Sequence, residues 1–176
     1  MCKVVVSMAN IQVDSKAAFQ AGLEQRLNKY DHSDALKKFS RHFFSEVPIA
    51  EIVRKDWDYA EGTLLSSWRF YSSFDGKRTL VRVFNPTQEK DGYEHKQTVI
   101  EVACANIPFL LQSLRIELNN QHIVLSDVQQ CLMSVIRDAS GKIVITDEDD
   151  PNETLIHLEV NRIGHASRLE RDIRST

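Results

Sequence analysis

The stretch Cys104-Ala105-Asn106-Ile107-Pro108 is the part of the sequence best suited to bind a small molecule. It joins an apolar run typical of a strand to a periodic apolar run typical of a helix. Such a junction presents unpaired backbone N–H groups at the positive end of a helix dipole, and these favour a carboxylate. The alternative interpretation is that Asn106 only caps its own helix, with Pro108 in the first turn.

Residue types used in catalysis are present, but without the spacing that catalysis needs. The six histidines and six glycines are scattered along the chain. The sequence has no G-x-G-x-x-G or G-x-x-x-x-G-K phosphate loop, no H-E-x-x-H metal motif and no G-x-S-x-G nucleophile elbow. We therefore expect this chain alone to contain no catalytic residue, no cofactor site and no metal site, and a free-standing enzyme is the least favoured interpretation.

The cysteines and the acidic run also have structural explanations. Cys2, Cys104 and Cys131 are far apart, which argues against a disulfide framework or a zinc site and is typical of a reducing compartment. The acidic run at 147–153 lacks the alternating ligands, the glycine and the final glutamate of a calcium loop. We interpret this run as a solvated loop.

Composition limits the class of protein. The chain has 176 residues, of which 42% are hydrophobic and 27% charged, as expected of a domain with a buried core. Its net charge of -3, with both signs interspersed, argues against a nucleic-acid partner. No apolar stretch approaches a signal peptide core or the roughly 20 residues of a membrane span. A cytoplasmic protein without a membrane partner is expected.

Residues 14–76 are predicted to form a helical subdomain, after an extended or disordered start at 1–13. Asp14, Ser33 and either Asp56 or Asp58 are candidate N-caps, and Pro48 is expected to end the second helix. Apolar residues recur on one face of each helix. These are Phe19, Leu23, Leu27 and Tyr30, then Leu36, Phe39, Phe43 and Val47, then Leu64, Trp68 and Tyr71.

Residues 77–176 change to the period of two that is typical of strands. In the last strand, Ile156, Leu158 and Val160 are expected to face inward, and His157 and Glu159 outward. The helix after Asn106 has the clearest apolar stripe in the chain. The expected strands are 79–84, 98–104, 123–136, 142–145 and 155–163, and the expected helices are 106–118 and 167–173.

This order predicts an α+β fold. Strand, helix, long strands with a hairpin, then a second helix make most of a ferredoxin-like βαββα(β) antiparallel sheet with helices on one face. The second helix is short and the closing strand is missing, so we expect a fragment whose sheet has an exposed edge.

Several segments, in order and spacing, resemble the amino-terminal region of the large bacterial NAD-specific glutamate dehydrogenases. They are 68–70, 81–86, 91–93, 98–102, 107–118 and 155–160. The resemblance implies an ACT-like regulatory region followed, far downstream, by the dehydrogenase and nucleotide-binding parts. It implies no cofactor in this fragment. The parent enzyme would use NAD to convert L-glutamate to 2-oxoglutarate and ammonia, a step of amino-acid catabolism.

The resemblance also implies an effector site. ACT modules often bind a small amino acid at the first strand–helix junction, which is Cys104 to Pro108 here. Many of them have a glycine after the proline, where this chain has Phe109, whose ring is expected to fill the ligand space. An amino-acid effector is one expected partner; the other domains of the parent chain and a second copy of this chain are the others.

Two functional hypotheses follow. In the first, the chain is a regulatory module that binds an effector near Asn106. In the second, it is an assembly module that pairs with other domains or subunits and binds no small molecule.

Overall fold

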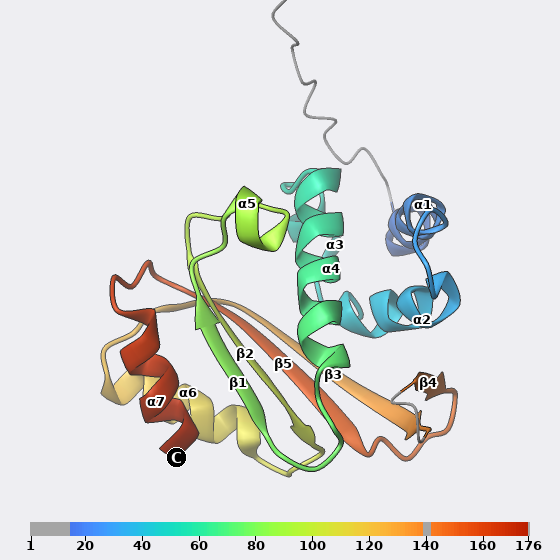
Figure 1. Ribbon diagram of the computed structural model, residues 1–176. Coiled ribbons are helices and arrows are strands. Elements are labelled where there is room, and N and C mark those ends of the chain that lie inside the picture. Colours follow the sequence, from blue (N-terminus) through green and yellow to red (C-terminus); the bar gives the residue numbers. More distant parts are fainter. Residues whose placement is uncertain (1–14, 139–141, 176) are drawn as a thin grey trace, which may run out of the picture.

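The structure, a computed structural model, describes residues 15–138 and 142–175. Helices come first along the chain, and the strands follow with further helices between some of them (Figure 1). In chain order the elements are α1 (Lys16–Leu27), α2 (Ser33–Phe43), α3 (Ile49–Ile52), α4 (Trp57–Ser72), β1 (Leu80–Phe84), α5 (Gln88–Asp91), β2 (Thr98–Ala105), α6 (Leu110–Asn120), β3 (Leu125–Arg137), β4 (Ile143–Thr146), β5 (Glu153–Val160) and α7 (Ala166–Ser175). Within the described ranges, no helix is both long enough and apolar enough to cross a membrane.

Side-chain caps start three of the helices, α1, α4 and α5, and two of them bear on the expected boundaries. The Ser15 hydroxyl accepts the backbone N–H of Ala18 at 3.2 Å and so caps α1, while Asp14 lies outside the described residues. Asp56 accepts the N–H of Tyr59 at 2.6 Å, which confirms it as the cap of α4. Each cap satisfies a backbone donor that the helix itself leaves unpaired.

Two expected helix boundaries are wrong. Ser33 is the first residue of α2 and not its cap, because the preceding His32 takes a left-handed backbone conformation with φ of 60°. Pro48 does not end α2, which already stops at Phe43. Instead Pro48 precedes the short helix α3, where its missing N–H leaves no hydrogen bond unmade.

The strands form one five-stranded antiparallel sheet in the order β1-β2-β5-β3-β4 (Figure 1). β3 is continuous: its first part pairs with β5 and its last four residues, 134–137, pair with β4. A register shift lies between Leu125 and Asp127. The predicted α+β class with an antiparallel sheet is confirmed.

β1 changes the expectation about the sheet edge. In a complete ferredoxin-like unit the strand after the second helix would pair beside β2, and β1, from before the unit, occupies that position. Side chains of α7 then cover the outer side of β1. Glu170 accepts the N–H of Val83 at 3.3 Å, and Arg174 donates to the carbonyl of Val81 at 2.6 Å. These are the backbone groups that another strand would use, so the expected open edge is wrong at β1.

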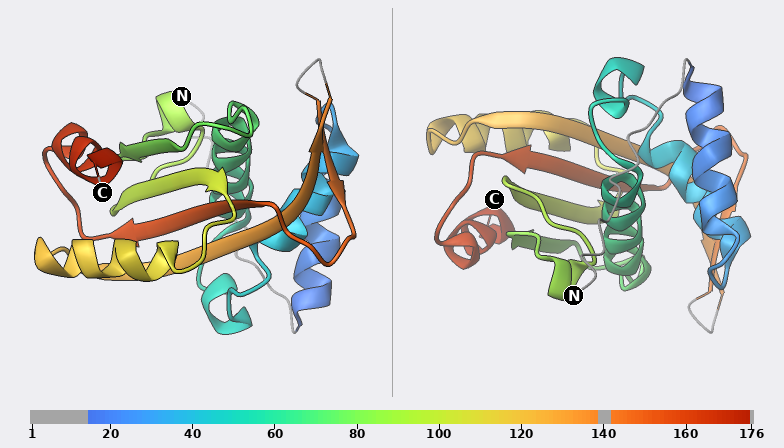
Figure 2. Two further views of the ribbon diagram at one scale, coloured as in Figure 1. Left: turned by 90° about the horizontal axis from the view of Figure 1, so that it is seen from below. Right: turned by 90° about the horizontal axis from the view of Figure 1, so that it is seen from above.

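Helices cover both faces of the sheet (Figure 2). The helices of the ferredoxin-like unit, α6 and α7, lie on one face, as expected. Their core contains Leu114, Leu118, Leu169 and Ile173 with apolar residues of β1, β2 and β5. The other face packs against α1 to α4, and there Phe39, Phe43, Leu64 and Tyr71 share one core with Ala103, Cys131, Met133 and Leu155 of the strands. The helical half is therefore docked on the sheet.

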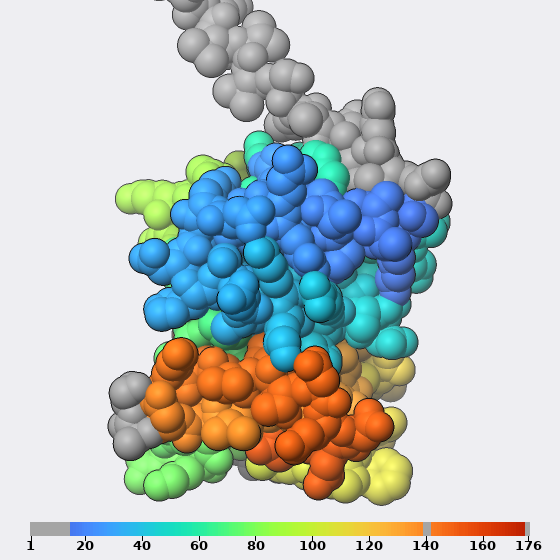
Figure 3. Space-filling view, turned by 90° about the vertical axis from the view of Figure 1, so that its right-hand side faces the viewer, coloured from blue at the N-terminus to red at the C-terminus, as the bar shows by residue number. Residues whose placement is uncertain are grey.

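The helical half also reaches the end of the β3–β4 hairpin. Figure 3 shows α1 and α2 directly above the strands of this hairpin. Lys38 of α2 bonds both the carbonyl of Ile145, at 3.1 Å, and the carboxylate of Asp147, at 2.9 Å. The last helical residue before the sheet is Ser72 and the first strand residue is Leu80, on either side of the predicted domain boundary at 76/77, which stays a prediction.

Candidate functional site

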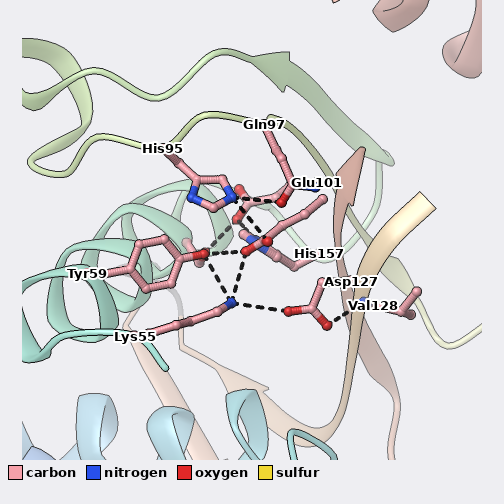
Figure 4. Close-up of polar contacts among 10 residues, drawn as sticks. Lys55, Tyr59, His95, Gln97, Glu101, Asp127, Val128 and His157 are labelled. Carbon is pink, nitrogen blue, oxygen red and sulfur yellow. Dashed lines mark hydrogen bonds and ion pairs between the residues drawn. The ribbon is translucent and has the colours of Figure 1, made fainter. Parts of the chain in front are cut away.

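A row of polar side chains crosses the sheet beneath the helical half. Arg82 of β1 lies opposite Glu101 of β2, Glu101 lies opposite His157 of β5, and His157 lies opposite Gln129 of β3. Side chains directly opposite each other on antiparallel strands are close enough to interact. Figure 4 shows the Glu101 and His157 part of this row, with groups from other elements converging on it.

Glu101 is a fully buried carboxylate, 0% exposed. It accepts three hydrogen bonds: from Nε of Arg82 at 2.5 Å, from the Ser67 hydroxyl at 2.5 Å and from Nδ1 of His157 at 2.8 Å. Burial alone would raise the pKa of Glu101, but the bond from His157 and the charge of Arg82 outweigh it and hold the pKa at about 2. Glu101 is therefore ionised at neutral pH.

His157 is buried between two carboxylates and is 1% exposed. Nδ1 contacts Glu101, while Nε2 faces Glu159 at 3.9 Å without a hydrogen bond. Burial alone would lower the pKa of His157, but the two glutamates raise it to about 9. The ring is thus an imidazolium at neutral pH, with both nitrogens protonated.

Glu159 connects this row to the start of α4. It accepts hydrogen bonds from the Tyr59 hydroxyl and from Nζ of Lys55, the latter at 3.3 Å, and Nε2 of His95 lies 3.1 Å away. Burial opposes the charge, yet His157 and His95 hold the pKa of Glu159 far below its usual range. Lys55 also pairs with Asp127 of β3 at 3.2 Å (Figure 4).

Burial decides what this cluster can do. Two carboxylates around an imidazole would suit acid–base chemistry in an open cleft. Here the side chains of Glu101, His157 and Glu159 are 0%, 1% and 3% exposed, so a substrate has no access to them. The cluster instead makes a polar bond between the helical half and the sheet.

A second polar anchor joins the far end of α4 to the sheet. Arg137 of β3 binds Glu153 of β5 through two bonds of 2.9 Å, and the Tyr71 hydroxyl donates to the same carboxylate at 2.5 Å. Burial, followed by the charge and hydrogen bond of Glu153, raises the pKa of Tyr71 far above its usual range. Together the two anchors fix both ends of α4 on the sheet.

The predicted effector junction is at the other end of β2. Cys104 is buried in the α6 and α7 core, whereas residues 105–108 are exposed. Asn106 does not cap α6, which begins only at Leu110. Its carboxamide donates to the carbonyl of Pro151 at 3.0 Å, and Pro108 precedes the helix without belonging to its first turn.

Phe109 is the residue that precedes α6. It takes a left-handed conformation with φ of 64°, and its side chain caps nothing. Phe109 is 76% exposed, and the expectation that its ring fills the ligand space stays a prediction. A bulky residue at positive φ is uncommon, and this is the position where glycine would be free of strain.

Comparison with known proteins identifies the family of this chain. The family model described as "Glutamate dehydrogenase, ACT1 domain" matches residues 39–174, which include both polar anchors and the junction. The chain belongs to this family.

Relatives of this ACT1-family chain are much longer. The NAD-specific glutamate dehydrogenase of Pseudomonas aeruginosa is 33% identical over 171 residues, covering 92% of this chain and 11% of its own length. That of Halomonas elongata is 29% identical over 171 residues, covering 94% of this chain and 10% of its own. The chain thus spans about a tenth of the length of these relatives. No solved structure matches.

Sequence reasoning missed the buried row of the ACT1-family chain. His157 and Glu159 were expected to face outward, and this is wrong, because the helical half covers the face to which they point. A signal was present: polar residues occur at the same alternate positions of three strands, at Arg82, Glu101 and His157. The alternation of apolar and polar residues shows that the polar side chains share the other face of the sheet. It does not show whether helices cover that face.

Proposed function

We propose that this chain is a non-catalytic, cytoplasmic, amino-terminal regulatory region of an NAD-specific glutamate dehydrogenase. The full-length parent would convert L-glutamate to 2-oxoglutarate and ammonia, with NAD as its cofactor. The match to the ACT1 family and the names of the two relatives support this assignment. NAD and the catalytic residues would be held by the part of the parent that lies outside this region.

One observation carries the non-catalytic part of the proposal. The acid–base residues of the site, Glu101, His157 and Glu159, are sealed between the helical half and the sheet. Arg82, Lys55 and Tyr59 satisfy them internally. Such groups can hold a fold together, but they cannot meet a substrate.

Regulation would act at Cys104 to Pro108. The exposed backbone of residues 105–108 leads directly to the amino terminus of α6, whose free N–H groups suit the carboxylate of an amino acid. Phe109, directly after this loop, is exposed as well.

Thermal-shift measurements on this chain would test the regulatory role. The ligands are the twenty amino acids, 2-oxoglutarate, NAD and NADH. A saturable rise in Tm with one amino acid and none with NAD is expected, since a ligand that binds only the folded state stabilises it. Asn106→Leu should abolish the rise, while Asn119→Leu, at the other end of α6, should leave it intact. A flat response to every amino acid would overturn the sensing role.

A second candidate function, assembly without a small molecule, is favoured by the outer side of α6. Ile116 lies on α6, and Phe109 and Ile107 are in the segment directly before this helix. These three side chains are 63%, 76% and 47% exposed, in that order. The partner would be another domain of the parent or a second copy. Size-exclusion chromatography with light scattering tests self-association, and a monomer at high concentration would leave only pairing with other domains of the parent.

A further inference from the structure

The buried groups beneath α4 form a chain of alternating charge. From β1 the sequence of signs is positive at Arg82, negative at Glu101, positive at His157 and negative at Glu159. It continues with positive Lys55 and negative Asp127. With His157 protonated, these charges balance. Without that proton, these six groups carry one excess negative charge, and an unbalanced charge on their buried members is unfavourable.

We infer that the proton on His157 holds the α3–α4 segment on the sheet, so that its loss releases this segment while the rest of the fold stays closed. The segment comprises α3, Lys55 and the first turns of α4. This inference goes beyond the proposed function, because it concerns the docking of the helical half and not an effector.

Neither of the two carboxylates that flank His157 restores the balance by taking up a proton. Glu101 and Glu159 both contact it directly or face it, and each is stabilised as the anion by further donors. Burial and Glu159 raise the pKa of Tyr59 well above its usual range, so Tyr59 stays neutral as well. The titratable or charged groups packed around the cluster are Arg82 of β1, Glu101 of β2, His95 in the loop before β2, Asp127 and Cys131 of β3, Glu159 of β5, Lys55 before α4, Tyr59 of α4 and Tyr93 in the loop after α5.

The release is local because the two ends of α4 are held differently. The start of α4 meets the sheet through polar contacts of Lys55 and Tyr59 with Glu159. The far end is held by Tyr71, which lies in the apolar core and bonds Glu153. Neither Tyr71 nor Glu153 contacts His157, so the excess charge left by deprotonation lies away from this end of α4.

Hydrogen exchange of the His157→Gln variant at neutral pH tests this directly, because glutamine fills a similar place without the charge. Amide exchange in residues 52–61 should speed up at least about tenfold more than exchange in residues 69–72 and in the strands. The matched control is His165→Gln, an exposed histidine before α7. Equal loss of protection throughout the described fold would overturn the inference, because it would mean general destabilisation.

A titration of the unmodified chain keeps the test decisive if the variant fails to fold. The ring signals of His157 and Tyr59 should move together in NMR spectra recorded as the pH is raised. Tyr59 is expected to report the release with the same midpoint as the imidazole. Independent midpoints, or a His157 ring that is already neutral at pH 7, would also overturn the inference.

Discussion

Gly22 of α1 lies against the indole of Trp57 so closely that a Cβ at Gly22 would be 2.6 Å from Cη2 of the ring. Trp57 is the first residue of α4 and also stacks on Phe19, with ring centroids 5.5 Å apart. The glycine thus sets the distance between α1 and α4. It has a packing role here, since its position in a helix interior would otherwise favour alanine.

We predict that Gly22→Ala destabilises the fold despite the better helix propensity of alanine. The added methyl group must displace the ring of Trp57, and such overpacking costs about 1–3 kcal/mol. Urea unfolding measures the loss. Gln25→Ala, at an exposed position of the same helix, is the control and should change little. A Trp57→Leu background should reduce the cost of the alanine, and an undiminished cost there would show that the ring is not its cause.

Removal of one charge from the buried row should be more damaging. Glu101→Gln leaves Arg82 and His157 without their shared anion, and the loss of one partner of a buried ion pair costs about 3–5 kcal/mol. Chemical unfolding at pH 7 would measure it. Glu94→Gln, an exposed position before β2, should be close to neutral. Equal stability of the two variants would contradict a structural role for the row.

Stability should decrease as the solution becomes alkaline. The pKa of His157 is raised from 6.5 to about 9, so the stabilisation by its proton is complete below pH 6.5 and disappears as the pH rises through 9. The displacement corresponds to about 3 kcal/mol. Urea unfolding between pH 6 and 10 should show this decline. His157→Gln should flatten it, and an unchanged slope in that variant would assign the decline to another group.

Glu101 should make stability depend on pH in the acidic range. Its pKa is lowered from 4.5 to about 2, so its contribution is present above pH 4.5 and is lost as the pH falls through 2. Acid unfolding should therefore be less steep in Glu101→Gln than in the parent sequence. Circular dichroism between pH 5 and 2 would follow the transition.

Arg174→Ala should open the covered edge of the sheet. The substitution removes the donor that occupies the carbonyl of Val81, and it weakens the hold of Glu170 on Val83. An unprotected edge strand favours pairing with a second chain. Concentration-dependent dimers are expected in light scattering. Arg168→Ala on the same helix is the control, and equal behaviour of the two variants would mean that α7 does not protect β1.

Phe109→Gly, compared with Phe109→Ala, should distinguish the effect of backbone strain on stability from the effect of the exposed ring on self-association. Glycine removes the cost of the left-handed backbone, on the order of 1 kcal/mol, and should raise the Tm. It also removes an exposed ring, so any self-association through α6 should weaken. Phe109→Ala removes the ring but keeps the strain and therefore should weaken association without the gain in Tm.

Much of the fold was predictable because residue patterns within single segments determine where its helices and strands lie. The stripe containing Leu114 and Leu118 predicted α6, and the alternation of Ile156, Leu158 and Val160 predicted both β5 and the face that packs on α6 and α7. Asp56 gave the start of α4 through ordinary capping chemistry. Each of these signals depends on neighbours within a few residues.

The buried row and the junction depend on distant parts of the chain. His157 is buried because α2 and α4, more than eighty residues earlier, cover this part of β5, and Phe43 of α2 packs against its ring. No pattern within β5 indicates these contacts. Asn106 has a sequence suited to capping, but Pro151 and Asn152 hold it in the loop through both its carboxamide and its backbone N–H. In both cases a tertiary contact overrides the local preference.

The central place of β5 has a consequence for how the chain acquires its structure during synthesis. β5 lies between β2 and β3, yet it is the last strand to leave the ribosome. Until then β2 and β3 have no partner to join them, and the apolar faces of α1 to α4 have only an incomplete surface to cover. Contacts of such long sequence separation form slowly, so the growing chain presents these faces to chaperones until β5 arrives.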